Sequence, residues 1–291
     1  MKQCAFLTLE ERGDFVIDDE HAIEPLARLG WQVSVLSWRQ QEIPWSNFDA
    51  VIIRSTWDYW DDVEGFMAAL ARIDLETHLA NPLALVRWNL AKSYLRDMEK
   101  QGVPIVPTLW SQTLQQDSLE KFCDQLDSDE IVIKPLVGAN GVDTFRLRRI
   151  GDEATVREMI DLFRGRPMLV QRFMPAILSE GEYSLFFFNG EFSHAILKVP
   201  AEGEFRSQEE RGAEIRRVVP EPLLLQRGRQ ALAVIQPAPL YARLDLVRTG
   251  AGDFALMECE LIEPSMYLRT DPQAPARFAQ AVDEWFEATS R

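Results

Sequence analysis

Histidine and cysteine are both scarce in this chain of 291 residues, which contains only three of each. The histidines show no paired spacing, which argues against a histidine metal site and against a Ser-His-Asp triad: His21, His78 and His194. The cysteines are scattered and lack CxxC spacing: Cys4, Cys123 and Cys259. This pattern predicts buried, reduced thiols in a cytoplasmic protein.

Long apolar runs and an excess of positive charge are also missing. No apolar run approaches the ~18 residues that a membrane-spanning helix needs, and residues 1–15 lack a signal-peptide core. The formal net charge of −15 argues against general nucleic-acid binding, which needs a basic surface. A phosphorylated ligand would have to be met by locally gathered cations, so the positions of individual lysines and arginines are informative.

Acidic residues occupy unusual places in residues 240–262. Two apolar, β-favouring runs are separated there by a glycine-containing break at 249–253, which is a hairpin signal. Because residues i and i+2 of a strand point to the same face, we expect Glu258 and Glu260 to project together, near Asp245 on the neighbouring strand. Converging carboxylates need a cation between them, and oxygen ligands suit Mg²⁺ or Mn²⁺. The alternative is a solvated hairpin whose acids face water.

Two lysines are candidates for contact with a ligand. Lys134 ends a short β-branched strand, and a loop with Gly138 and Gly141 follows, whose backbone N–H groups can surround a phosphate. The spacing matches neither GxxxxGK[ST] nor GxGxxG, and a simple hairpin explains the loop equally well. Lys92 lies in the first turn of an expected helix at 91–101, where a cation opposes the helix dipole. A ligand-facing role for Lys92 and an ordinary position on the helix surface are equally good interpretations.

A polar and aromatic cluster at 54–60 follows a short apolar strand at 49–53. In open α/β sheets, ligands bind beyond the carboxyl ends of the strands. Arg54, Ser55 and Asp58 are therefore candidates for substrate recognition. A helix-capping loop with aromatic packing is an equally good interpretation.

The order of the expected elements favours an α/β protein that begins with a βαβ-type domain of about eighty residues. Asn189-Gly190, between expected strands at 182–188 and 191–199, is the strongest hairpin signal. Asp18 and Asp19 are expected to cap a helix at 21–29. The other expected strands lie at 2–9, 31–37, 131–135, 144–149, 168–173 and 215–219, and the other expected helices at 61–71, 118–126, 152–163, 220–235 and 273–288.

Taken together, these pieces resemble the ATP-grasp superfamily from about residue 88 to the end of the chain. The sharpest match is in the hairpin, where Arg243 precedes Asp245 by two residues and Glu258 follows Asp245 by thirteen. Glu260, two residues further on, departs from the family, which usually has asparagine there. The resemblance implies ATP as the nucleotide, with Mg²⁺ (or Mn²⁺), and two metal ions, held by Asp245, Glu258 and Glu260.

The same resemblance implies roles for other residues. Those implied for the nucleotide are Lys92 and Lys134 at the phosphates, the loop from Gly138 to Gly141 over them, Gln171, Arg172 and Phe173 at the adenine, and Glu182 at the ribose. Those implied for the phosphoryl-transfer and substrate side are Lys198, Arg206 and Arg243.

The fold that the resemblance implies is α/β, an ATP-grasp fold with an N-terminal βαβ pre-ATP-grasp domain and two lobes that clasp ATP. We expect the N-terminal domain at 1–86 and the ATP-grasp domain at 87–291, divided into a mobile small lobe at about 103–175 and a metal-binding catalytic lobe at about 176–291. Residues 54–60 and 261–265 look most like the branch that contains the cycloserine-forming ligase.

The implied activity is ATP-dependent ligation of a carboxylate to an amine through an acyl phosphate. The implied partners are a small amino-acid-like or peptide carboxylate and an amine, with neither nucleic acid nor membrane, and a homodimer is possible because relatives often dimerise. One alternative is an ATP-grasp kinase that phosphorylates a small molecule. Another is a non-catalytic nucleotide-binding regulatory protein, for which degraded ligand positions would be expected.

Overall fold

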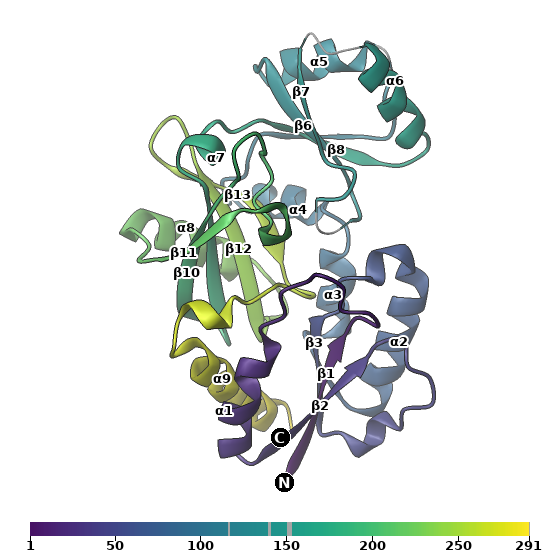
Figure 1. Cartoon of the computed structure of the whole chain (residues 1–291), viewed down its shortest axis with the longest axis vertical. Coiled ribbons are helices and arrows are strands. Elements are labelled where there is room, and N and C mark those ends of the chain that lie inside the picture. Colours follow the sequence, from purple (N-terminus) through teal and green to yellow (C-terminus); the bar gives the residue numbers. More distant parts are fainter. Residues whose placement is uncertain (116, 139–140, 150–152, 291) are drawn as a thin grey trace.

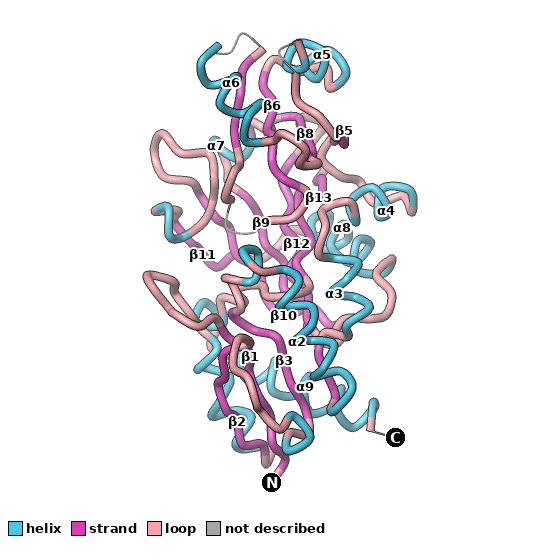
Figure 2. Tube along the Cα trace, turned by 90° about the vertical axis from the view of Figure 1, so that its right-hand side faces the viewer, coloured by secondary structure: helices cyan, strands magenta, loops and turns pink. Residues whose placement is uncertain are grey.

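The computed structural model describes the whole chain except residues 116, 139–140, 150–152 and 291. Its strands form three sheets that follow one another along the long axis of the molecule (Figure 1). The view from the side shows the same succession, with the N-terminus at one end and β6 and β8 at the other (Figure 2). None of the helices in the described ranges combines the length and hydrophobicity that crossing a membrane requires.

The first sheet is parallel, with strand order β2-β1-β3-β4. Alternate residues of β1 and β3 face two different cores, as the two-residue period of a strand requires. Helices α2 and α3 cover one face, and α1 and the C-terminal helix α9 cover the other (Figure 1). The bounds are β1 Lys2–Thr8, β2 Trp31–Ser37, β3 Ala50–Ser55, β4 His78–Ala80, α1 Ile23–Arg28, α2 Val63–Glu76, α3 Leu83–Asn89 and α9 Ala274–Thr289.

The central sheet is antiparallel, with order β11-β10-β9-β12-β13. Asn189 and Gly190 join β9 to β10 with φ values of 48° and 85°, the positive pair that a tight hairpin turn requires. One face packs on α4 and α8 in an apolar core, and the other carries polar side chains. The bounds are β9 Glu182–Phe188, β10 Glu191–Val199, β11 Glu214–Val218, β12 Tyr241–Arg248, β13 Phe254–Glu260, α4 Tyr94–Lys100 and α8 Pro222–Ala233.

The third sheet is antiparallel, with order β5-β8-β6-β7, and packs against α5 and α6. Its bounds are β5 Thr108–Ser111, β6 Glu130–Pro135, β7 Phe145–Arg148, β8 Met168–Arg172, α5 Ser118–Gln125 and α6 Glu153–Leu162, and the short α7 Ala176–Ser179 follows it. Five single 3₁₀ turns lie in the described connections: Asp19–Ala22, Trp45–Asn47, Tyr59–Asp61, Glu209–Arg211 and Leu268–Thr270.

Two local expectations were wrong. Lys92 is not in the first turn of a helix; it lies in the turn between α3 and α4, where its backbone N–H donates to the carbonyl of Leu136. Asp18 and Asp19 do not cap the following helix, because their carboxylates accept from Arg269 and Arg54. The expected strand at 144–149 and helix at 152–163 are present as β7 and α6, although residues 150–152 lie outside the described ranges.

Candidate active site

The polar face of the central sheet gathers charged side chains from neighbouring strands. Asp245 on β12 pairs in register with Glu258 on β13, and Arg243 pairs with Glu260. The register shifts after Asp245 and leaves Met257 as an extra residue of β13, so Met257 and Glu258 both line the cavity while Leu256 lies in the apolar core. The predicted hairpin is therefore present, and its acids do not simply face water.

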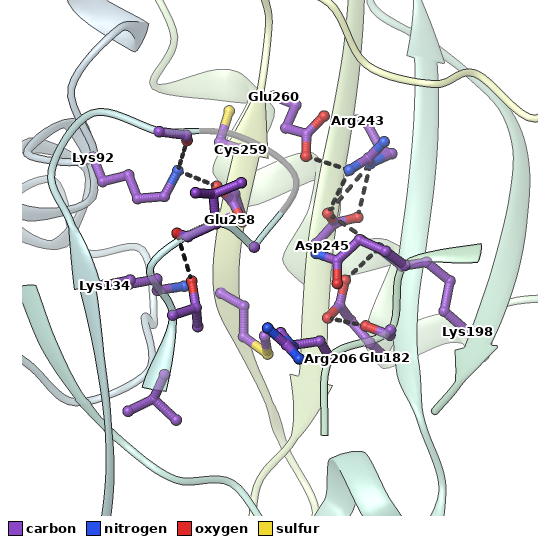
Figure 3. A pocket seen from close by; sticks show the side chains of 18 of the residues that line it. Lys92, Lys134, Glu182, Lys198, Arg206, Arg243, Asp245, Glu258, Cys259 and Glu260 are labelled. Carbon is purple, nitrogen blue, oxygen red and sulfur yellow. Dashed lines mark hydrogen bonds and ion pairs between the residues drawn. The ribbon is translucent and has the colours of Figure 1, made fainter. Parts of the chain in front are cut away.

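Arg243 lies between two of these acids (Figure 3). Its guanidinium donates to Asp245 at 3.1 Å and also pairs with Glu260. Burial opposes its charge, but Asp245 and Glu260 outweigh burial and raise the pKa of Arg243. Asp245 also accepts from Ser184 at 2.5 Å and lies 3.4 Å from the ammonium of Lys198. The arginine and the lysine thus offset the cost of burying Asp245.

Lysines reach the site from both sides (Figure 3). Lys92 pairs with Glu258 at 2.6 Å and donates to the carbonyl of Gly138 at 3.0 Å. Although burial opposes its ionisation, the charges of Lys92 and then Lys134 lower the pKa of Glu258 to about 2. Lys134 is buried, and among the described residues its ammonium has no hydrogen-bond or ion-pair partner. It is therefore free to meet an anion.

Lys198 pairs with Glu182 on the neighbouring strand. Burial disfavours the charged lysine, but Asp245 and Glu182 together raise its pKa. Glu182 in turn accepts from the hydroxyl of Ser207 at 2.7 Å. Glu182, predicted to contact a ribose, is thus paired with Lys198, predicted to act on the phosphoryl-transfer and substrate side.

The acids do not form a preassembled metal cluster. Within the described part of the chain, no group of three or more histidine, cysteine, aspartate or glutamate side chains is placed to hold one metal ion. Glu258 is engaged by Lys92, and Asp245 and Glu260 by Arg243. Carboxylate oxygens fit Mg²⁺ chemically, so metal binding would require exchange of these ion pairs. The predicted metal role of Asp245, Glu258 and Glu260 stays a prediction.

A large cavity joins this face to the third sheet. Lys92, Lys134, Gly138, Gly141, Gln171, Arg172, Phe173, Glu182, Lys198, Arg206, Arg243, Asp245, Glu258 and Glu260 all line it. The side chain of Gln171 donates to Thr108 at 3.1 Å, whereas that of Arg172 turns away to the carbonyl groups of Leu126 and Asp127. Met174, Ile177 and Met257 add apolar walls beside them.

Gly141, the last residue of the loop predicted to cover phosphate, reaches the opposite wall. Ala139 and Asn140 lie outside the described residues. Gly141 has φ +63°, and a Cβ there would lie 3.3 Å from Arg206 and 3.2 Å from Gln208, so this approach favours glycine. Arg206 is bound to Glu204 at 2.7 Å and lowers the pKa of Glu204 to about 2.

The predicted substrate residues Arg54, Ser55 and Asp58 do not line this cavity. Arg54 is 1% exposed, and its guanidinium donates to Asp19 at 2.9 Å and to the Pro264 carbonyl at 3.1 Å. Ser55 lies 2.8 Å from the Thr8 hydroxyl. Asp58 binds Trp38 and Arg39 at a separate surface hollow. These contacts favour the packing interpretation for Arg54, Ser55 and Asp58.

Sequence reasoning missed other cavity residues. Phe15, Trp57, Tyr59, Glu263 and Tyr267 line the side nearest the first sheet. The run Leu-Ile-Glu-Pro-Ser at 261–265 was the available signal, because a glutamate between apolar residues and proline is out of place in a core segment. The position of this run at the cavity could not be derived from the sequence, since it depends on how the first sheet packs against the central sheet.

The cavity lies between two antiparallel sheets, and lysines reach it from both sides while acids lie beside an arginine. This arrangement is typical of the class of nucleotide-binding proteins that the resemblance implied. Residues 99–226 match the model of the prokaryotic glutathione synthetase ATP-grasp domain, and residues 4–81 match that of the N-terminal domain of D-cycloserine synthetase DcsG.

Known proteins show the same likeness over nearly the whole chain. The cycloserine biosynthesis protein DcsG of Streptomyces lavendulae is 32% identical over 279 residues, which cover 90% of this chain and 91% of that protein. The crystal structure of D-cycloserine synthetase DcsG superposes with a TM-score of 0.86 and 28% identity, covering 98% of this chain and 99% of that one. Glutathione synthetase of Bradyrhizobium diazoefficiens is 31% identical, over 58% of this chain and 50% of that protein.

The chain therefore belongs to the ATP-grasp ligases, in the branch that contains DcsG. The predicted fold class is confirmed, and so is the predicted activity class, an ADP-forming, ATP-dependent carboxylate–amine ligase. The family generally uses ATP and Mg²⁺. The kinase and the regulatory alternatives are not supported.

Proposed function

We propose that this ligase activates the carboxylate of a small amino-acid-like substrate and joins it to a nitrogen of the same molecule, which closes a ring. One observation carries the proposal: Arg243, Asp245, Glu258 and Glu260 share one face of the central sheet, at a cavity that also exposes Lys92, Lys134 and Lys198. The ring-closing part rests on the 32% identity to DcsG over 90% of this chain.

The cavity supports specific roles for the nucleotide. We assign the phosphates to Lys92 and Lys134, because Lys134 is buried without a partner in the described structure and Lys92 can leave Glu258 for a more negative group. Gly138 and Gly141 would lie beside the phosphates. Gln171, Arg172 and Phe173 receive the adenine, with Glu182 at the ribose.

Asp245, Glu258 and Glu260 would hold Mg²⁺, and we propose two ions. Bound there, Mg²⁺ would neutralise charge on the phosphates. Arg243, Lys198 and Arg206 would stabilise the charge that spreads over the transferred phosphoryl group. A substrate carboxylate oxygen forms a bond to the γ-phosphorus as ADP leaves. The nitrogen then attacks the acyl carbon, phosphate leaves, and the nitrogen loses a proton.

We also propose a division of labour among the parts of the chain. Residues 1–86 contribute to the substrate side, about 103–175 form the small lobe, and about 176–291 form the lobe with the acids. The contacts of α9 qualify this boundary, because α9 packs on the first sheet and its Asp283 accepts from Trp31 at 2.8 Å. The C-terminal helix would therefore travel with the N-terminal part in any lobe motion.

The test is a product analysis with a defined probe. Hydrolysis of the ring amide of cycloserine gives 3-aminooxyalanine, so both enantiomers of this compound are incubated with the enzyme, ATP and Mg²⁺. We expect stoichiometric release of ADP and phosphate, and a product lighter than the probe by one water. A product that forms only when a second amine is added would overturn ring closure, and phosphate release without any change in carboxylate mass would overturn ligation of this substrate.

A further inference from the structure

Glu263 is held in place by an unusually complete set of backbone contacts around it. The carbonyl groups of all five residues in the Leu261–Ser265 segment each accept a hydrogen bond from a side chain of another element: Leu261 from Asn81 at 2.7 Å, Ile262 from Tyr241 at 2.9 Å, Glu263 from Trp57 at 2.8 Å, Pro264 from Arg54 at 3.1 Å and Ser265 from Arg243 at 3.2 Å. Backbone fixed in this way gives the Glu263 side chain a fixed origin.

The carboxylate of Glu263 differs from four other acids of the cavity in lacking a cation. Glu182, Asp245, Glu258 and Glu260 each form an ion pair with a lysine or an arginine. Glu263 lines the same cavity and is only 9% exposed, yet it has no ion pair among the residues that the structure describes. A buried carboxylate without a counter-charge is costly.

The surroundings of Glu263 show the same imbalance. Burial, followed by the negative charge of Glu260, raises the pKa of Glu263 to about 8, and Lys92 and Arg243 offset this only in part. The hydroxyl of Tyr59 lies near the carboxylate, and both residues line the cavity. Burial and the nearby charges of Glu263 and Glu260 keep that hydroxyl protonated by raising the pKa of Tyr59. What the position lacks is a cation.

Aromatic rings complete the walls around this position. Trp57 and Phe15 line the cavity, and their ring centroids are 5.2 Å apart in an edge-to-face arrangement. Aromatic faces attract cations and exclude water, which strengthens a nearby charge pair. A carboxylate, a phenol and two aromatic rings form a good receptor for an ammonium group.

The reactants of the ligation leave one source for that cation. ATP and the substrate carboxylate are both anionic, and the metal ions have Asp245, Glu258 and Glu260 as ligands in the proposed function. An amino-acid substrate adds a protonated α-amino group. The Leu261–Ser265 segment contacts both regions that such a molecule would occupy. Ser265 accepts a hydrogen bond from Arg243, on the phosphoryl-transfer side, and Glu263 accepts one from Trp57, at the proposed ammonium site.

We propose that Glu263, with Tyr59, Trp57 and Phe15 around it, binds the ammonium group of the amino-acid substrate and so selects amino acids over simple carboxylic acids. This inference rests on the proposed function, because it names how the same site recognises its substrate. Glu263 is a binding and specificity residue here, and its role requires its charge but no proton transfer.

The test compares two probes that differ only in the ammonium group, 3-aminooxyalanine and 3-aminooxypropanoate. Wild type should prefer the former in kcat/KM, and Glu263→Gln should lower kcat/KM for it by about 10- to 100-fold while leaving 3-aminooxypropanoate within about twofold. The matched control is Glu210→Gln, which removes the same charge from an exposed position at the cavity. It should change neither value by more than about twofold.

Binding measured by calorimetry, with a non-hydrolysable ATP analogue and Mg²⁺, separates this inference from the proposed reaction. If wild type binds 3-aminooxyalanine but makes no ring, and Glu263→Gln weakens that binding selectively, the reaction fails and the inference stands. Equal loss for both probes, or a changed Mg²⁺ requirement instead of a changed KM, overturns the inference while the ligase stands. Absence of binding to either probe overturns both.

A second variant guards against misfolding of Glu263→Gln. Tyr59→Phe removes the hydroxyl near Glu263 and keeps the ring. It should reduce the preference for 3-aminooxyalanine by about 5- to 10-fold, since the charged carboxylate loses a neighbouring hydrogen-bonding group. An unchanged preference in a folded Tyr59→Phe enzyme, together with an unchanged preference in Glu263→Gln, counts against the subsite.

Discussion

Lys92 and Glu258 form an ion pair of 2.6 Å, although Lys92 lies in the turn between two helices and Glu258 lies on β13. In the proposed function, Lys92 binds phosphate and Glu258 binds Mg²⁺. The pair therefore keeps two nucleotide-binding groups charged and close together before MgATP enters. Binding would exchange one ion pair for two interactions with the nucleotide complex.

Glu258→Gln should lower turnover by about 10²- to 10³-fold, because the carboxylate charge that Mg²⁺ needs is lost while the side-chain size is kept. The measurement is phosphate release over a range of Mg²⁺ concentrations. Glu191→Gln, at the exposed end of β10, is the control and should behave as wild type. Wild-type turnover in a folded Glu258→Gln enzyme would contradict the metal assignment.

Arg243→Lys should lower kcat by about 10²-fold and leave the KM for ATP within about threefold. Lysine keeps the charge but cannot contact Asp245 and Glu260 at the same time, as the guanidinium does. Steady-state kinetics of ADP formation check this. Arg248→Lys is the matched control, because Arg248 lies on the same strand and pairs with Glu180. A loss confined to the KM for ATP would instead place Arg243 at the nucleotide.

Glu260→Asn introduces the asparagine that the resemblance to the ATP-grasp superfamily leads us to expect at this position. The variant loses one negative charge beside Asp245 and Glu258 but keeps an oxygen ligand. We expect the Mg²⁺ concentration for half-maximal activity to rise by about fivefold, with kcat largely retained, since one charged contact is worth about 1–2 kcal/mol. Titrations with Mg²⁺ and Mn²⁺ measure this. A fall in kcat without a change in metal requirement would show that Glu260 acts on the substrate side.

Arg54→Met should destabilise the fold by about 3 kcal/mol, because it leaves Asp19 buried without its cation. The KM for the carboxylate substrate should not change. Denaturant unfolding and steady-state kinetics separate the two effects. The double variant Asp19→Asn, Arg54→Met should recover part of the lost stability. A raised KM with unchanged stability would restore the substrate-binding interpretation of Arg54.

His194 predicts a loss of stability on acidification. It is buried, it stacks on Phe186 at 4.2 Å, and burial lowers its pKa to about 4. Between an unfolded pKa of about 6.5 and this folded value, the unfolded chain binds a proton that the folded chain does not. The stability that neutral His194 contributes is fully present above pH ~6.5 and is lost as the pH falls towards ~4. The loss in the free energy of unfolding amounts to about 2 kcal/mol by pH ~5.

The measurement is the free energy of unfolding between pH 7 and pH 5 for wild type and His194→Gln. The glutamine can still donate to the Met266 carbonyl, which lies 2.9 Å from the histidine Nε2. The variant should lose less stability than wild type over this range, although its stability at pH 7 is lower. Parallel curves for the two proteins would show that His194 does not remain neutral in the fold.

Much of the site was predictable because its spacing is local. Residues i and i+2 on a strand share a face, and the turns at 189–190 and 249–253 set the register of their hairpins, so Asp245, Glu258 and Glu260 had to lie together once the hairpin formed. The family likeness follows from the same spacing. For strands with strong alternation and helices with a clear helical period, the predicted ends likewise lie within a few residues of the observed ends.

What the sequence could not determine were contacts between distant segments. The exclusion of Arg54 from the cavity depends on Asp19 and Pro264, and the placement of Glu263 depends on Trp57 and Arg243. Local propensity contains no information about such partners, because burial and ion pairing are decided when sheets pack against one another. The sequence alone therefore determined the strands, the hairpins and the set of charged residues, whereas only the tertiary structure decided which charges are paired and which, such as Lys134 and Glu263, are left for a ligand.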